Sequence, residues 1–155
     1  MSNVFLNIGS NLGDRKALIE KALESIGGIF GFYCTSGFVE SEAWGYDSPN
    51  RFLNIGLAFK TDLGPEEVLA ELQKIEKEIS EVSHRDNLGN YADRELDIDI
   101  MAIDELLFNS PRLCLPHIHL TERDFFMVPL SELEPKWRDP RSGRLISELI
   151  GNSKR

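Results

Sequence analysis

Four segments of the chain carry the residue pattern of β-strands, namely 4–8, 29–41, 52–60 and 94–100. The first and third alternate apolar residues with polar or small ones, and the second is rich in aromatic and β-favouring side chains. In the last segment, Leu96, Ile98 and Ile100 alternate with charged residues. A period of two is typical of a strand with one buried face. The sequence therefore predicts a sheet built from these four strands.

Two helices are predicted between these strands. The first has apolar residues at helical spacing, can be capped by Asp14, and is expected to stop at Gly27 and Gly28. The second begins near Pro65 and forms one apolar stripe through Val68, Leu69, Leu72, Ile75 and Ile79. The resulting order, β-α-β-β-α-β, predicts an α+β fold with a ferredoxin-like antiparallel sheet.

A C-terminal extension follows the predicted ferredoxin-like unit. The segments 106–108 and 113–115 have the composition of a short strand pair. A short helix is expected over 121–127, with Thr121 and Asp124 in capping positions, and a last helix over 142–150. No linker-like stretch divides the chain, so 1–155 is expected to form a single domain.

Composition limits the classes of partner. The net charge of −9 argues against a general nucleic-acid or anionic-membrane binder, because those partners favour a basic face. No apolar run approaches the length of a membrane span. Cys34 and Cys114 lack metal-ligand spacing and are expected to be reduced. We therefore expect a soluble cytoplasmic protein, without nucleic-acid or membrane partners, and a monomer.

Asp97 and Asp99 are the strongest candidates for chemistry. On a strand both aspartates share one face, opposite Leu96 and Ile98, with their backbones roughly 6.5 to 7 Å apart. Two carboxylates on one face can bind hard cations that carry phosphate oxygens. The alternative is a half-buried strand whose outer face is merely solvated.

Two further segments contain residues that suit a ligand carrying phosphate. The small and polar residues of 7–14 leave a strand just before a helix, which can present backbone donors to an anion or form an ordinary turn. In the segment 115–126, Arg123 suits phosphate because its guanidinium donates two hydrogen bonds; the alternative is an ordinary surface arginine. His117 and His119 lack the further ligands that a zinc site needs. Phe52 and Phe125 can stack on a flat heterocycle or be core residues, and Asn54 offers a donor and an acceptor for the edge of such a ring.

Together these motifs resemble the 6-hydroxymethyl-7,8-dihydropterin pyrophosphokinase family of folate biosynthesis. The resemblance rests on the segments 7–13, 52–54, 93–100, 115–117 and 123–125, which follow the family's order over 4–130. It implies a ferredoxin-like ATP-dependent diphosphotransferase that moves pyrophosphate from ATP to the pterin hydroxyl and releases AMP. The implied partners are ATP, the pterin and two Mg²⁺ ions.

The resemblance also implies roles for individual residues. Asp97 and Asp99 match the metal ligands, and the catalytic set adds Arg94 and Arg123. The pterin is expected to contact Ser41, Trp44, Phe52, Asn54 and Phe125. ATP is expected to contact Gln73, Glu76, Arg85, Arg94, His117 and Arg123.

The chain departs from the family pattern after the second predicted helix. Family members commonly carry a Gly-Arg-x-Arg element there, but residues 80–85 read Ser-Glu-Val-Ser-His-Arg. His84 or Arg85 can take the place of the missing cations, and Arg85→Ala is then expected to slow turnover. Two alternatives stay open: a binding module that keeps the pocket without catalysis, and an unrelated phosphotransferase that releases ADP. The residues by themselves do not separate attack on the β-phosphorus from attack on the γ-phosphorus.

Overall fold

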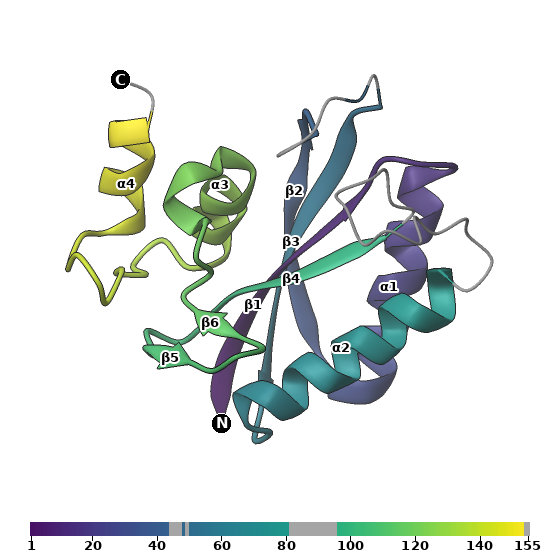
Figure 1. Ribbon diagram of the computed structural model, residues 1–155, viewed down its shortest axis with the longest axis horizontal. Coiled ribbons are helices and arrows are strands. Elements are labelled where there is room, and N and C mark those ends of the chain that lie inside the picture. Colours follow the sequence, from purple (N-terminus) through teal and green to yellow (C-terminus); the bar gives the residue numbers. More distant parts are fainter. Residues whose placement is uncertain (44–47, 49, 81–95, 154–155) are drawn as a thin grey trace.

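A four-stranded antiparallel sheet forms the centre of the computed structural model, which describes residues 1–43, 48, 50–80 and 96–153 (Figure 1). Its strands are β1 (Ser2–Ser10), β2 (Tyr33–Ser41), β3 (Phe52–Thr61) and β4 (Asp97–Ile103). They lie in the order β2-β3-β1-β4, with every neighbouring pair antiparallel. This confirms the predicted ferredoxin-like arrangement, in which the first and last strands are neighbours although most of the chain separates them.

Helices α1 (Arg15–Phe30) and α2 (Pro65–Ser80) cover one face of the sheet (Figure 1). Their buried stripes, Ile19, Ala22 and Ile26 on α1 and Val68, Leu72 and Ile75 on α2, pack on the alternate apolar residues of β1, β3 and β4. The predicted stripe of the second helix is confirmed. Asp14 also caps α1 as expected, because its side chain accepts the Ala17 N–H at 3.1 Å.

The C-terminal part of the chain covers the other face (Figure 1). It contains β5 (Phe108–Asn109), β6 (Cys114–Leu115), the 3₁₀ turn η1 (Leu120–Glu122), α3 (Asp124–Leu133) and α4 (Ile146–Ser153). A second apolar core lies here, centred on Trp137, Phe126, Met101 and Leu130. The sheet is therefore buried on both faces, and α3 packs on β2 and β3.

The predicted boundaries of three helices were wrong. Helix α1 continues through Gly27 and Gly28 to Phe30, so residues 29 and 30, predicted as strand, are helical. The helix is capped by Gly31, whose φ of 87° suits a residue without a side chain. The last turn of α1 is held by Phe30, which stacks on Phe59 with ring centroids 4.2 Å apart. At Gly27 a side chain would crowd Tyr33, since a Cβ atom would lie 3.1 Å from its Cε1. Gly27 therefore lets the Tyr33 ring pack against the helix, and it does not end the helix.

Helices α3 and α4 also begin later than predicted. Thr121 lies in the 3₁₀ turn, and the residue before α3 is Arg123, whose side chain makes no capping hydrogen bond. Helix α4 starts at Ile146, because a tight loop occupies the residues before it. Among the described residues, no helix is long and apolar enough to span a membrane.

Candidate functional site

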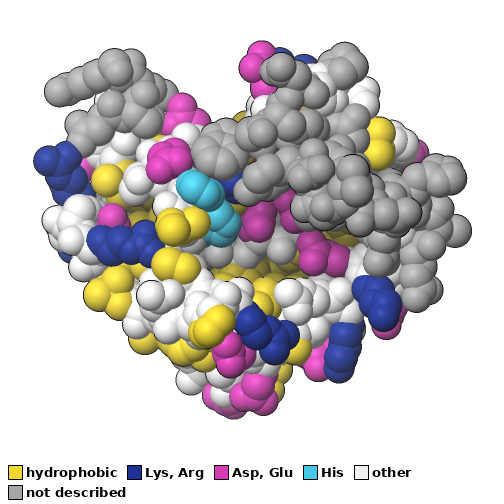
Figure 2. Space-filling view, in the orientation of Figure 1, with side chains coloured by type: hydrophobic (Ala, Val, Ile, Leu, Met, Phe, Trp, Pro, Cys, Tyr) yellow, Lys and Arg dark blue, Asp and Glu magenta, His cyan; other side chains and the backbone are white. Residues whose placement is uncertain are grey.

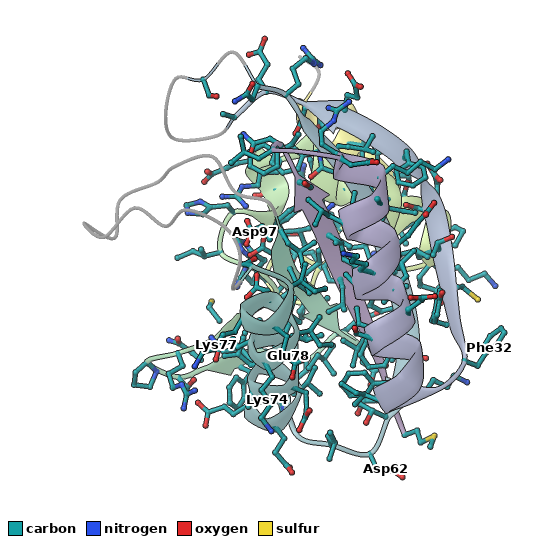
Figure 3. All side chains as sticks on the ribbon, turned by 90° about the vertical axis from the view of Figure 1, so that its right-hand side faces the viewer. Phe32, Asp62, Lys74, Lys77, Glu78 and Asp97 are labelled. Carbon is teal, nitrogen blue, oxygen red and sulfur yellow. The ribbon has the colours of Figure 1, made fainter. Side chains whose placement is uncertain are left out.

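Asp97 and Asp99 lie at the start of β4 on the face of the sheet that α1 and α2 leave uncovered. The register pairs Asp97 with Gly9 and Asp99 with Asn7, while Ile98 pairs with the fully buried Ile8. Cross-strand partners share a face, so both aspartates point away from the α1–α2 core, as the sequence predicted. Each is half-buried. Figure 3 shows Asp97 close to the end of α2.

Glu76, on α2, is tied to the backbone between the two aspartates. One of its carboxylate oxygens accepts the Ile98 N–H at 2.7 Å. Ile98 is on an edge strand, so its outward N–H has no neighbouring strand to bind and needs another acceptor. Gln73, one turn earlier on α2, is exposed. The structure thus brings Glu76 into contact with the aspartate strand.

His117 faces the second aspartate. Its Nε2 lies 3.8 Å from Asp99 Oδ1, and its Nδ1 accepts the backbone N–H of His119 at 3.1 Å. An imidazole whose Nδ1 accepts a hydrogen bond carries its proton on Nε2 when neutral. The N–H of His117 is therefore presented towards Asp99. Figure 2 shows histidine side chains beside acidic ones at the margin of a hollow in this face.

Phe126 supports both His117 and Arg123. The His117 ring meets it edge-on, with centroids 5.0 Å apart, and the Arg123 guanidinium lies 4.8 Å from its centroid. Phe126 is fully buried, so it forms a fixed apolar base for two groups with polar ends. Phe125 packs against it edge-on at 5.2 Å and is half-buried. The start of α3 thus carries both Arg123 and Phe125.

Asn54 is buried on the same face as the aspartates, across β1 from Asp97. Gly9 pairs with Asn54 on one side and with Asp97 on the other. The Asn54 amide nitrogen donates to Ser41 Oγ at 2.8 Å and to the Val39 carbonyl at 3.2 Å. Both amide hydrogens are therefore used, and Oδ1 is the atom that can accept from a ligand.

Gly9 keeps the space beside that oxygen open. A Cβ atom at Gly9 would lie 2.8 Å from Asn54 Oδ1 and 3.3 Å from Phe52 Cδ1. Phe52 is two residues from Asn54 on β3, so the two side chains share a face. The described structure thus gathers Ser41, Phe52 and Asn54 around Gly9.

Three predicted site residues, Trp44, Arg85 and Arg94, lie outside the described residues, as does His84. The sequence pointed to no individual role for Phe126 or Asn7, although both lie in segments that it singled out, 115–126 and 7–14. Phe126 reads as an ordinary core phenylalanine, and its role comes from its contacts with His117 and Arg123. Asn7 donates from its side chain to the Phe125 carbonyl at 2.7 Å.

The Asp97 and Asp99 carboxylates suit Mg²⁺ better than a metal ion whose ligands all come from the protein. Within the described ranges, no group of three or more His, Cys, Asp and Glu side chains is arranged to hold a metal ion. Mg²⁺ is commonly bound by one or two carboxylates, with substrate phosphates and water as the other ligands. Asp97 and Asp99 meet that requirement.

Comparisons with known proteins show the family of this chain. Residues 5–135 match the family model described as 7,8-dihydro-6-hydroxymethylpterin-pyrophosphokinase. A 2-amino-4-hydroxy-6-hydroxymethyldihydropteridine pyrophosphokinase of Porphyromonas gingivalis is 41% identical over 144 residues, covering 92% of this chain and 97% of that protein. The protein of the same name from Aquifex aeolicus is 39% identical over 149 residues, covering 96% of this chain and 91% of its own.

A solved structure described as HPPK-DHPS in complex with substrates has the same fold, with a TM-score of 0.75 at 12% identity. It covers 97% of this chain, which spans only 43% of that longer protein. The family match and the relatives place the predicted motifs in one known family. The chain belongs to the 7,8-dihydro-6-hydroxymethylpterin-pyrophosphokinase family, whose members are pyrophosphokinases of folate biosynthesis.

Proposed function

We propose that this chain transfers pyrophosphate from ATP to the hydroxyl of 6-hydroxymethyl-7,8-dihydropterin, giving the pterin diphosphate and AMP. The observation that carries the proposal is the pairing of Gly9 with both Asp97 and Asn54. It puts a carboxylate suited to metal-bound phosphate and an amide suited to a heterocycle on one face, on either side of a residue without a side chain. ATP and the pterin are proposed as substrates because the chain belongs to the family.

Asn54 is the proposed recognition group for the pterin. Its Oδ1 can accept from an N–H on the edge of the ring, because Ser41 and Val39 already bind its amide nitrogen. Phe52 and Phe125 are proposed to stack on the two ring faces. Trp44 is assigned to the same pocket from the family resemblance alone.

Asp97 and Asp99 are the proposed ligands of two Mg²⁺ ions that arrive with ATP. Such ions supply charge neutralisation and polarise the attacking hydroxyl. The N–H of His117 and the guanidinium of Arg123 are proposed to bind phosphate oxygens. Arg94 and Arg85 are assigned to nucleotide on the resemblance, and Gln73 and Glu76 to the nucleotide side of the cleft.

The proposed reaction depends more on how the substrates are positioned than on removal of a proton by a base. The described site contains no imidazole or carboxylate whose contacts single it out as a base, and phosphoryl transfer depends mainly on alignment and electrostatic stabilisation. Phe126 keeps His117 and Arg123 in place from beneath. The division into a stacked ring and a charged phosphate chain predicts that pocket variants lose pterin affinity, while aspartate variants lose turnover.

The proposal extends to the whole chain. We infer that residues 1–155 act as one pyrophosphokinase domain, as a monomer in the cytoplasm, with ATP and the pterin as small-molecule partners. The HPPK-DHPS likeness extends over less than half of that longer protein, so it adds no second activity.

The test is analysis of nucleotide products after incubation with ATP, Mg²⁺ and 6-hydroxymethyl-7,8-dihydropterin. We expect AMP to form only when all three are present, and Asp97→Ala and Asp99→Ala to abolish it while the proteins stay folded. Asp62→Ala is the matched control, because Asp62 is exposed and lies far from the site along the sheet (Figure 3). Release of ADP would indicate a simple kinase, and binding without AMP would indicate a binding module. Full activity in both aspartate variants would refute the metal assignment.

A further inference from the structure

The peptide group that joins Pro116 to His117 is held from both sides. Its N–H, on His117, donates to the Met101 carbonyl of β4 at 2.8 Å. Its carbonyl, on Pro116, accepts a hydrogen bond from the Arg141 guanidinium. The C=O and N–H of a peptide point in opposite directions, so two such bonds fix the orientation of its plane. The backbone from which the His117 ring projects is therefore set by β4 on one side and by Arg141 on the other.

Arg141 also contacts the strand that leads into this peptide. The same guanidinium nitrogen lies 3.3 Å from Cys114 Sγ, on β6. Pro116 is buried, so its carbonyl has little access to water and a charged donor is a strong partner for it. Arg141 thus connects the C-terminal segment to the short chain between β6 and His117.

The loop that carries Arg141 is built around a buried carboxylate. Asp139 is 4% exposed, and its two oxygens accept the Arg141 N–H at 3.0 Å and the Ser142 hydroxyl at 3.1 Å. Its backbone N–H binds the Arg144 carbonyl at 2.9 Å, and Gly143 turns the chain with a φ of 74°. These hydrogen bonds hold the loop in one conformation, so the backbone position from which the Arg141 side chain extends is fixed.

We propose that Arg141 is a positioning residue for His117, acting through the Pro116 carbonyl. It lies beyond residue 135, where the match to the family model ends, so this role is not carried over from that match. Without Arg141, the peptide keeps its bond to Met101, and on the opposite side the Pro116 carbonyl keeps only the weak Cys114 thiol donor at 3.7 Å. The charged donor that restrains that side is lost. The His117 ring then samples orientations in which its Nε2 no longer faces Asp99. The effect on rate rests on the proposed pyrophosphokinase function, whereas the effect on ring orientation does not.

The first variant is Arg141→Met, which keeps an apolar side chain of similar reach and removes the donors. Arg141→Lys retains one charged donor group and should recover part of the effect. Arg144→Met is the matched control, because Arg144 is an exposed residue of the same loop. Thermal unfolding of each variant checks that it is folded. We expect Arg141→Met to lower kcat/KM for ATP by about tenfold, with KM for the pterin unchanged.

Two readouts separate positioning from a general structural role. Long-range ¹⁵N–¹H spectra of the imidazoles report which ring nitrogen carries the proton, and the chain has only three histidines to assign. We expect Arg141→Met, but not Arg144→Met, to shift the His117 signals. In a His117→Gln background, Arg141→Met should cause little further loss of rate, because the residue through which it acts is gone.

The outcomes are distinct. A shifted His117 signal and non-additive rates support the proposal. An Arg141→Met variant that matches Arg144→Met in spectrum and rate overturns it, as does a loss that adds fully to that of His117→Gln. If the unmodified protein makes no AMP but the His117 signal still shifts, the pyrophosphokinase function fails and the positioning role stands.

Discussion

Asn7 donates its side-chain amide to the carbonyl oxygen of Phe125, at 2.7 Å, from the centre of the sheet to the first turn of α3. In a regular helix, that carbonyl would accept the N–H of residue 129, but residue 129 is proline and has none. Asn7 therefore satisfies the group that Pro129 cannot bind. The same contact places Phe125, a proposed stacking partner of the pterin, over the aspartate face.

Removing this contact should reduce both stability and pterin binding. We expect Asn7→Ala to lower the free energy of unfolding by about 1–3 kcal/mol, because it leaves a carbonyl without its partner. KM for the pterin should rise several-fold while KM for ATP changes less. Chemical denaturation and steady-state kinetics measure the two effects.

The Pro129→Ala background provides the control for Asn7. Alanine restores an N–H at position 129 that can bind the Phe125 carbonyl, so Asn7→Ala should be less harmful there. A double-mutant cycle should show a coupling energy of about 1 kcal/mol. Fully additive losses would contradict the assignment of Asn7 to this carbonyl.

Gly56 should tolerate no side chain. A Cβ atom there would lie 2.6 Å from Pro129 Cβ and 3.0 Å from Leu133 Cδ1, so α3 would have to move off β3. We expect Gly56→Ala to lower the free energy of unfolding by about 1–3 kcal/mol. Gly28→Ala is the opposite case, because that helical glycine has no atom within 4 Å of its Cβ position. The Gly28→Ala substitution should raise the free energy of unfolding by about 0.5–1 kcal/mol. A lower free energy of unfolding would contradict the finding that the space beside Gly28 is open.

The hydrogen bond that Glu76 accepts from Ile98 should matter more than the negative charge of Glu76. Glu76→Ala leaves the Ile98 N–H without its acceptor, so we expect a loss of about 1–3 kcal/mol in unfolding free energy and slower AMP production. Glu76→Gln retains an oxygen that can accept this bond and should retain most of both. Glu78→Ala, an exposed position on the same helix, is the control (Figure 3). Equal behaviour of Glu76→Ala and Glu78→Ala would show that the bond to Ile98 has no functional weight.

Ser41 tests pterin recognition separately from phosphate chemistry. Its hydroxyl holds the Asn54 amide at 2.8 Å, while the Val39 carbonyl remains as the second partner. We expect Ser41→Ala to raise KM for the pterin by about three- to tenfold, with kcat and KM for ATP nearly unchanged. Ser147→Ala, on an exposed face of α4, controls for loss of a hydroxyl elsewhere. A fall in kcat with unchanged pterin KM would place Ser41 outside the pocket.

Local sequence patterns were enough to predict the sheet, the two helices that cover its first face and the orientation of the aspartates. These features depend on local periodicity, since alternation fixes which side chains of a strand share a face. The motifs around Asn54, Asp97, His117 and Phe125 identified the family, and the family match confirmed it. Helix ends were harder to predict, because whether Gly27 stops a helix depends on Tyr33, which lies on another element.

Which residues support the site depends on how separate elements pack, and this could not be predicted from the sequence. Asn7, Phe126 and Arg141 each gain a role from a partner outside their own element: the Phe125 carbonyl, the ring of His117 and the Pro116 carbonyl. Glu76 was expected near the nucleotide, and the structure adds a hydrogen bond in which the Ile98 N–H of β4 donates to the Glu76 carboxylate of α2. Local patterns record which face a residue occupies, whereas such contacts depend on how separate elements pack, and no periodicity along the chain encodes that distance.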